Sequence, residues 1–502
     1  MKRACFVFLL CLALVLGTAA AIALPVCQSR EEVAVTAETR AGDPAQAAGL
    51  TARQGMEYQR RLLWDVTIPA DRPEESRTTY TYVSDPADLP QREPTYWGIE
   101  LYSPRSSSVG FSGGSEGLKE ILEFDRSFLG VDAILEDVAS RAPETGRYAE
   151  VIDPADYRDT YPLSMETDLP NVDSWRYSPH GWAGSEEVEA YDRIIQTLEG
   201  FFSFPIPPED NAWEVVIEKN EAGDFVGLEL HPQTGGFVMN TVSAVGTETC
   251  FFAFAQNYGE ASLDFSQVPG GSGVYAIDYP LGEGFSLLDM DSLRNFCPLP
   301  EGTDLIDLAL SEDETTLVVV TYRGGTYTCT VLDAASAAVC QSFSIPASPP
   351  EPVYTIYYDE EGEPMEEETS YSWGISGLLW EKDCLLIYGN DTMSLYLQKG
   401  QGFTHAMTAE PPEALRYNAQ NMAMAWNGEK LALAVPSYES AYDLSFTLSV
   451  FREGELVYEG VYENSLNAIT DVREEETYDN NTYMFYSYIL PFDANRLSIR
   501  WQ

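Results

Sequence analysis

Short apolar segments separated by turn-forming residues dominate the chain after residue 200. Runs of roughly four to eight strand-favouring residues, with Gly, Asn or acidic turns between them, are typical of antiparallel strands joined by hairpins. The first four runs predict consecutive strands of one sheet, at 213–218, 225–230, 236–242 and 248–254. We therefore expect residues 201–502 to form an all-β domain.

Two repeated patterns occur in this region. One pattern consists of an apolar strand, an acidic or Asn-Gly turn and a second apolar strand, and it occurs three times. Aligning the three copies places Leu317, Leu385 and Leu431 at equivalent positions. Segments 286–292 and 330–336 share an apolar residue, Leu, Asp and, three residues after the Asp, Ser. An Asp that opens a type I turn accepts hydrogen bonds from the turn amides, so the second pattern predicts a turn between two outer strands. Repeats of about 40 to 50 residues are typical of β-propeller blades.

These turns and this strand order resemble bacterial WD-repeat-like β-propellers, from about Trp213 to the C-terminus. The Gly-His and Trp-Asp dipeptides of WD repeats are missing from these blades. The resemblance implies a disc of radial, four-stranded antiparallel blades that serves as a recognition surface, and it implies no active site. An insertion at 353–373 interrupts the repeat and is expected to form a strand, an acidic turn and a second strand.

Residues 60–200 include helical patterns and are assigned to an α+β segment. The clearest helix is predicted from Ser185 to Leu198, with Ser185 as its N-cap and acidic residues in its first turn. Asp132 is expected to cap a second helix and Ser115 a third. The chain after Ser465 supplies too few strands for a blade, so we expect a strand between Leu62 and Tyr102 to close the ring.

The N-terminus carries an export signal. Lys2 and Arg3 precede a run from Ala4 to Val26 without any charged residue, which is long enough to cross the roughly 30 Å hydrocarbon core as a helix. Positive charge before such a run holds that end in the cytoplasm. Residues 1–27 are therefore a signal anchor or signal peptide. Residues 28–59, rich in Ala, Thr, Glu and Arg, are expected to form a stalk.

Three fates of this leader remain open. An uncleaved single-pass anchor fits the length of the apolar run best and places the rest of the chain outside the cytoplasm. Cleavage after Ala21 or Ala23 would release a secreted protein. Leu24 to Cys27 resemble a lipobox, and lipidation of Cys27 would anchor the chain by lipid.

Acidic residues outnumber basic ones by 80 to 29, which gives a formal net charge of -51. Such a surface repels phosphate backbones and anionic lipid headgroups, so we expect no nucleic-acid partner and membrane contact only through the leader. Cationic ligands are favoured. The charge is also explained by solubility alone, as for a monomeric exported protein.

Few residues of the sequence are candidates for a catalytic or metal-binding site. The three histidines, His180, His231 and His405, are not at metal-ligand spacing with one another or with cysteines. Segment 110–114 matches the G-x-S-x-G pattern of hydrolases around Ser112, without the alternation of parallel strands and helices that normally surrounds it. The sequence does not decide whether the protein binds calcium: no EF-hand loop occurs, and Asp289-x-Asp291 is typical of a turn. We assign no catalytic, cofactor-binding or metal-binding residue.

Five cysteines follow the leader: Cys250, Cys297, Cys329, Cys340 and Cys384. A four-residue loop at 333–336 would place Cys329 opposite Cys340 on adjacent strands, where a disulfide could form. The alternative is that all are small buried side chains.

The sequence leaves three functional hypotheses. The first is a membrane-anchored extracytoplasmic binding or sensing β-propeller without catalytic activity. The second is an extracytoplasmic hydrolase that acts on glycans through Asp/Glu pairs. The third is an envelope scaffold for protein–protein interaction, which would expose a large apolar patch. The 30 Tyr and 9 Trp residues suit sugar stacking or cation–π capture, but they also suit half-buried strands.

Overall fold

The computed structural model describes residues 33–58, 62–84, 97–101, 109–115, 117–119, 122, 131–167, 185–206, 212–234, 237–259, 263–278, 288–358, 364–417, 422–437, 443–467, 489–491 and 497–502. The predicted leader, residues 1–27, and nearly all of the helix expected after Ser115 lie outside these ranges. None of the helices within them combines the length and the hydrophobicity needed to span a membrane. The chain divides into two compact units, Glu93–His405 and a second unit built from Met1–Arg92 with Ala406–Gln502.

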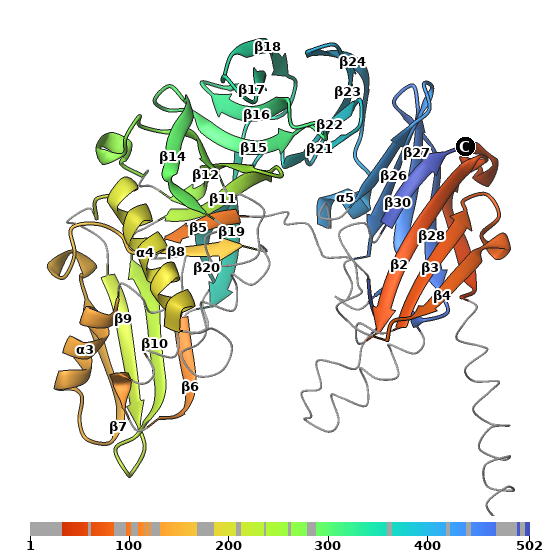
Figure 1. Cartoon of the computed structure of the whole chain (residues 1–502). Helices are drawn as coiled ribbons and strands as arrows, with labels where there is room; N and C mark the ends of the chain where they lie inside the picture. Colours follow the sequence, from red (N-terminus) through yellow and green to blue (C-terminus); the bar gives the residue numbers. More distant parts are fainter. Residues whose placement is uncertain are drawn as a thin grey trace, which may run out of the picture. The chain divides into compact units, whose positions relative to one another are not determined.

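Three four-stranded sheets follow one another along the first of these units (Figure 1). In each, the strands pair in the order in which they occur in the chain. This up-and-down order is that of β-propeller blades, as predicted. Their strands are β11 (Phe237–Val245), β12 (Thr249–Gly259), β13 (Gly273–Asp278) and β14 (Asp289–Pro298); β15 (Asp304–Leu310), β16 (Thr316–Arg323), β17 (Thr326–Asp333) and β18 (Val339–Ile345); and β21 (Gly377–Glu381), β22 (Cys384–Tyr388), β23 (Met393–Lys399) and β24 (Gly402–Ala409).

The middle sheet, β15–β18, is covered on both faces. Successive side chains of a strand point to opposite faces. In β16, Leu317 and Val319 belong to an apolar cluster shared with β11–β14, whereas Val318 and Val320 belong to one shared with β21–β24. The first strand, β15, lies against the first strands of both neighbours, β11 and β21. The three sheets are therefore packed face to face as consecutive blades.

The leucine repeat is confirmed. Leu317, Leu385 and Leu431 each lie at the start of the second strand of a sheet, and each is completely buried. The insertion is also confirmed as two paired strands, β19 (Glu351–Tyr358) and β20 (Pro364–Ser372).

The first predicted blade is wrong in its grouping. The four strands exist, but β9 (Ala212–Lys219) and β10 (Phe225–Thr234) belong to a different sheet from β11 and β12. That sheet has the order β6-β10-β9-β7, with β6 at Val109–Ser115 and β7 at Gly146–Ile152. The second edge of β10 is occupied by a strand about 110 residues earlier in the chain, and apolar periodicity carries no information about such a distant partner.

Two predicted helices are confirmed and cover sheets of this unit. Helix α3 (Asp132–Arg141) buries Ile134, Leu135 and Val138 against β9 and β10. Its N-cap is Val131, so Asp132 is the first helical residue and not the predicted cap. Helix α4 (Ser185–Phe201) begins at the predicted residue and runs three residues beyond the predicted end. Its apolar side packs on an aromatic cluster that includes Phe202, Phe252 and Tyr275. A two-stranded sheet, β5 (Trp97–Leu101) with β8 (Leu163–Thr167), lies beside β11.

The other unit consists of two sheets that share one apolar core. One has the order β1-β28-β27-β26-β25, and the other is built from β2, β3 and β4 with the C-terminal strands β29 and β30, both of which pair with β2. Their bounds are β1 (Val35–Gly42), β2 (Leu50–Tyr58), β3 (Leu62–Pro69), β4 (Arg77–Tyr82), β25 (Ala423–Trp426), β26 (Lys430–Pro436), β27 (Phe446–Arg452), β28 (Glu455–Asn464), β29 (Ile489–Pro491) and β30 (Leu497–Trp501).

The predicted stalk is wrong for residues 33–58. This segment forms β1, which pairs with β28, and β2, which pairs with β30. Its buried side chains include Ala47, Leu50 and Ala52. Small residues of this kind resemble a linker in composition, and the strands are fixed by pairing with the C-terminal part of the chain.

The prediction that a strand between Leu62 and Tyr102 closes a propeller ring over residues 201–502 is wrong. The C-terminal strands β25–β30 belong to the two-sheet unit and not to the unit of the three blades. The partner of β29 and β30 is β2, which precedes the predicted region from Leu62 to Tyr102. Strands β3 and β4, which lie in that region, extend the same sheet on the far side of β2.

A pair of glycine variants tests the docking of β1. Gly42 and Gly49 both have positive φ, 73° and 83°, so alanine strains the backbone at either position. A Cβ at residue 42 would overlap the Val457 carbonyl, whereas nothing lies within 4 Å of a Cβ at residue 49. We expect Gly42→Ala to lower the free energy of unfolding by about 1 to 3 kcal/mol more than Gly49→Ala, measured by urea denaturation. Equal losses would mean that β1 is not held against β28.

Candidate functional site

A pocket of about 280 Å³, open to solvent on one side, lies between the β15–β18 and β21–β24 sheets. Its lining comes from four places: β15, the end of β20, the segment that follows β20, and the turn between β22 and β23. The lining residues are Leu305, Ile306, Ser372, Trp373, Ile375, Ser376 and Asn390. Three aliphatic side chains and one indole are thus combined with two hydroxyls and one amide, which is the mixture typical of small-molecule sites.

The wall that carries Trp373 is held by β16 and β17. The Tyr327 hydroxyl accepts a hydrogen bond of 2.8 Å from the Gly374 N–H. The rings of Tyr322 and Trp373 meet edge to face with centroids 5.7 Å apart. Ile375, next in the chain, is 2% exposed. Because the segment is tied at three successive residues, Trp373 is positioned by the blade beside it.

The polar side of the pocket is organised by a side-chain hydrogen bond. Asn390 Nδ2 donates to Ser372 Oγ at 2.6 Å. Asn390 lies in the turn that connects β22 to β23, which is closed by a bond of 2.9 Å from the Gly389 N–H to the Thr392 carbonyl. The bond from Asn390 leaves the Ser372 hydroxyl proton and the Asn390 carbonyl oxygen with hydrogen-bonding capacity.

Asp307 links the two sheets next to the pocket. It follows Ile306 in β15, and its carboxylate accepts hydrogen bonds from the Leu308 N–H at 2.8 Å and from the Leu378 N–H of β21 at 2.9 Å. Burial among protein atoms raises the pKa of Asp307 to about 6, and the two backbone N–H groups oppose this rise. Burial also raises the pKa of Tyr388, with a smaller contribution from the negative charge of Asp307.

The raised pKa of Asp307 predicts a pH dependence of stability. Between the unfolded value near 3.9 and the folded value of about 6, the folded protein binds more protons than the unfolded chain. This group therefore makes the free energy of unfolding fall as pH rises from about 4 to 6. We expect Asp307→Asn to remove that component, measured by urea denaturation from about pH 4.5 to 7.

Asp333→Asn is the matched control. Hydrogen bonds from Ser336 lower the pKa of Asp333, so its titration affects stability only below about pH 4. This variant should keep the wild-type slope between about pH 4.5 and 7. Identical slopes in Asp307→Asn and the wild type would contradict the assignment.

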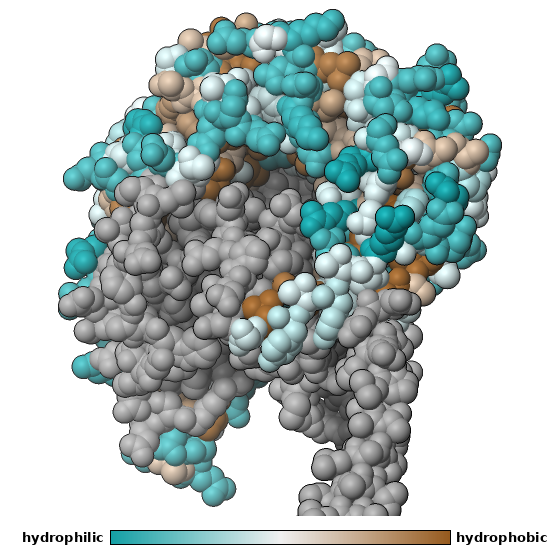
Figure 2. Space-filling model, turned by 45° about the vertical axis from the view of Figure 1, so that its right-hand side comes forward, coloured by the Kyte–Doolittle hydropathy of each residue, from teal (hydrophilic) through white to brown (hydrophobic). Residues whose placement is uncertain are grey.

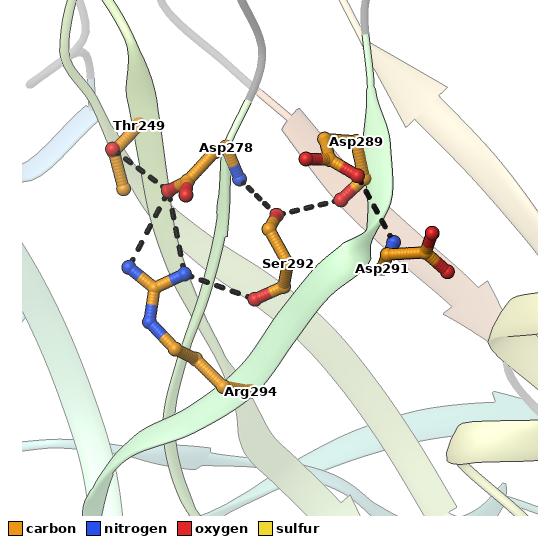
Figure 3. Close-up of polar contacts among 6 residues, drawn as sticks. All are labelled: Thr249, Asp278, Asp289, Asp291, Ser292 and Arg294. Atoms are coloured by element: carbon orange, nitrogen blue, oxygen red, sulfur yellow. Dashed lines mark hydrogen bonds and ion pairs between the residues drawn. The ribbon is translucent and has the colours of Figure 1, made fainter.

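The Asp-x-x-Ser segments serve structural roles. In the turn between β17 and β18, the N–H and hydroxyl of Ser336 donate to Asp333 Oδ1 at 2.9 and 2.6 Å, as predicted. The other copy does not form the predicted turn, because Asp289 to Ser292 lie within β14. There Ser292 Oγ donates to the Asp289 carbonyl and accepts from the Asp278 N–H, which ties β13 to β14 (Figure 3).

Asp278 is the centre of this second arrangement. Figure 3 shows Thr249 and Arg294 converging on its carboxylate; Thr249 Oγ1 donates at 3.0 Å, and Arg294 Nη1 lies 3.3 Å away. The Asp289 side chain accepts from the Asp291 N–H at 3.2 Å. Within the described ranges, no group of three or more His, Cys, Asp or Glu residues is placed to hold a metal ion.

The other sequence candidates lie apart from the pocket. His231 Nε2 contacts Glu229 Oε2 at 3.0 Å on β10, and His405 on β24 packs against the Tyr396 ring. His180 lies outside the described residues. Ser112 is in the interior of strand β6, opposite Gly227 of β10, whereas a nucleophile elbow requires a sharp turn between a strand and a helix.

The proposed pairing of Cys329 with Cys340 is wrong. The turn is longer than expected, since the Asp333 N–H bonds to the Ala338 carbonyl, and the register places Cys329 opposite Phe343. Both thiols are free; Cys329 is buried and Cys340 is exposed. Burial raises the pKa of Cys329 to about 12, so this thiol stays protonated at neutral pH.

Exposed apolar residues are scattered over the described surface. The large ones are Tyr82, Val151, Val339, Val353 and Leu456, on five different strands. In the view of Figure 2, the described surface is mostly hydrophilic and its hydrophobic residues form small separate areas.

No protein-family model matches the chain, and no curated protein sequence is similar to it. Among solved structures, it is similar to the β-propeller domain of the trilobed protease from Pyrococcus furiosus, with 10% identity, a TM-score of 0.22, and coverage of 51% of this chain and 65% of that one. It is also similar to the Swd1 (Cps50) β-propeller domain from Myceliophteria thermophila, with 11% identity, a TM-score of 0.23, and coverage of 52% and 83%. A third is the C-terminal WD40 domain of Sif2, with 11% identity, a TM-score of 0.21, and coverage of 49% and 65%.

The chain spans less than two thirds of the length of the first solved structures that it matches, from 48% to 65%. TM-scores near 0.2 carry no argument about function. The fold assignment rests on the strand order and on the two-sided packing of the blades, and both are those of a β-propeller. Sequence reasoning missed the pocket, because residues 305–306 are more than 60 positions from the rest of the lining at 372–376 and 390; the local signal was the aromatic Trp373 at the end of the insertion.

Proposed function

We propose that this protein is an extracytoplasmic binding protein, held at the membrane by its N-terminal segment, which takes a small molecule in the pocket between the β15–β18 and β21–β24 sheets without transforming it. The observation that carries the proposal is the lining: one aromatic side chain, aliphatic side chains and a few polar groups from two strands and two connecting segments converge in a half-open cavity. A hydrolase would need carboxylates to converge there, and none is found among the described residues of the lining.

A filled pocket tests this function. Ser376 lies at the exposed side of the lining, so Ser376→Trp should fill the pocket without disturbing the core. A ligand that binds only the folded protein raises its melting temperature. We expect at least one compound in a screen of neutral sugars, amines, short peptides and carboxylic acids to raise the Tm of residues 28–502, and Ser376→Trp to abolish the rise.

Ser140→Trp is the control, because Ser140 is an exposed residue on α3 and does not line the pocket. It should leave both the Tm and its rise with ligand unchanged. A ligand-induced rise of equal size in Ser376→Trp would place the binding site elsewhere and refute the proposal.

Membrane attachment is tested separately. The full chain is expected in the membrane pellet of the producing cell after alkaline extraction, because an apolar run of this length stays inserted. Residues 28–502 alone should be in the supernatant. Recovery of the protein in the soluble fraction with its N-terminus at residue 22 or 24, shown by mass spectrometry, would contradict an uncleaved anchor.

A further inference from the structure

None of the pocket's described lining residues is charged, although 22% of the chain is charged and the net charge is -51. An ionic ligand would lose its hydration there without gaining an opposite charge among the lining residues. The surrounding acidic surface also repels anions. The lining therefore favours a neutral ligand.

The two sides of the pocket differ in polarity. Trp373 and Ile306 offer apolar surface, whereas Leu305 is almost fully buried, and an indole ring stacks well on the C–H face of another ring. Ser372 and Asn390 offer both donors and acceptors from groups that already bond to each other at 2.6 Å. A suitable ligand has one apolar face and a rim of groups that donate and accept at once.

Size sets a further limit. A volume of about 280 Å³ corresponds to about nine water molecules and lies just below the usual range for ligand sites, which begins at about 300 Å³. It fits one six-membered ring with its substituents. A neutral pyranose meets all three conditions, because its C–H groups form apolar faces and its hydroxyls each donate and accept.

We infer that the pocket binds one uncharged pyranose unit of a glycan, with Trp373 as the stacking wall and the Ser372–Asn390 pair as the hydrogen-bonding group. This inference rests on the proposed binding function and names its ligand class. The open side of the pocket allows the sugar to be either free or the end of a longer chain.

The test uses sugars matched in shape and different in charge. Isothermal titration calorimetry on residues 28–502 compares glucose, galactose, mannose and N-acetylglucosamine with glucosamine and with glucuronate and galacturonate. We expect saturable binding of at least one neutral sugar, and binding at least tenfold weaker for its uronate. Trp373→Ala should weaken the binding of the neutral sugar at least tenfold. Trp380→Ala, which changes a tryptophan of β21 that does not line the pocket, should change it less than twofold.

A charge variant provides a readout that partial unfolding would not produce. Asn390→Asp keeps the shape of the side chain and adds a negative charge beside Ser372. The ratio of the affinity for glucosamine to the affinity for glucose should be at least fivefold higher in this variant than in the wild type. An unchanged ratio would show that Asn390 does not contact the sugar and would overturn the inference.

The outcomes separate this inference from the proposed function. Saturable binding of an amine, a peptide or a uronate that Ser376→Trp abolishes, without binding of any neutral sugar, overturns the sugar assignment and leaves the binding function standing. Neutral-sugar binding that is the same in Trp373→Ala and the wild type overturns the site. Absence of any Ser376-sensitive ligand overturns both.

Discussion

The two-sided burial of the β15–β18 sheet is the constraint on which the rest of its unit depends. Alternate residues of β16 enter two different apolar clusters, so this sheet is stable only with a sheet packed on each face. Strand β16 is apolar on both sides, which gives a run of buried residues from Thr316 to Thr321 in place of the alternation expected for a half-exposed sheet. Face-to-face stacking of blades satisfies that requirement.

The pocket is a consequence of the same stacking. Where β15 meets β21, the hydrogen bond from the Leu378 N–H to Asp307 joins the two sheets. The insertion β19–β20 enters the chain between these two blades and ends at Ser372, so it brings Trp373 to their junction. A segment that interrupts the repeat thus supplies the aromatic wall and part of the polar lining. Its fixed position follows from Tyr327, which belongs to the blade itself.

The acidic composition affects solubility, whereas the uncharged pocket lining determines which ligand can be recognised. Charge spread over the surface keeps the chain soluble and repels anions, but it selects no particular ligand. Recognition requires a few groups that converge in a partly desolvated space, and such groups here are uncharged. Described carboxylates such as those of Asp333 and Asp278 instead accept hydrogen bonds in a turn and at a strand end.

The sequence by itself determined the local elements: the leucine repeat at the start of second strands, helices α3 and α4, the inserted hairpin, and the Asp333 turn. These depend on residues a few positions apart, whose periodicity and capping groups can be read directly. The tertiary structure alone decided which strands share a sheet. Val35 pairs with Asn464, and β10 pairs with β6, because such partners are selected by packing among residues hundreds or scores of positions apart. The pocket belongs to this second class, since Leu305, Trp373 and Asn390 meet only when two blades pack together.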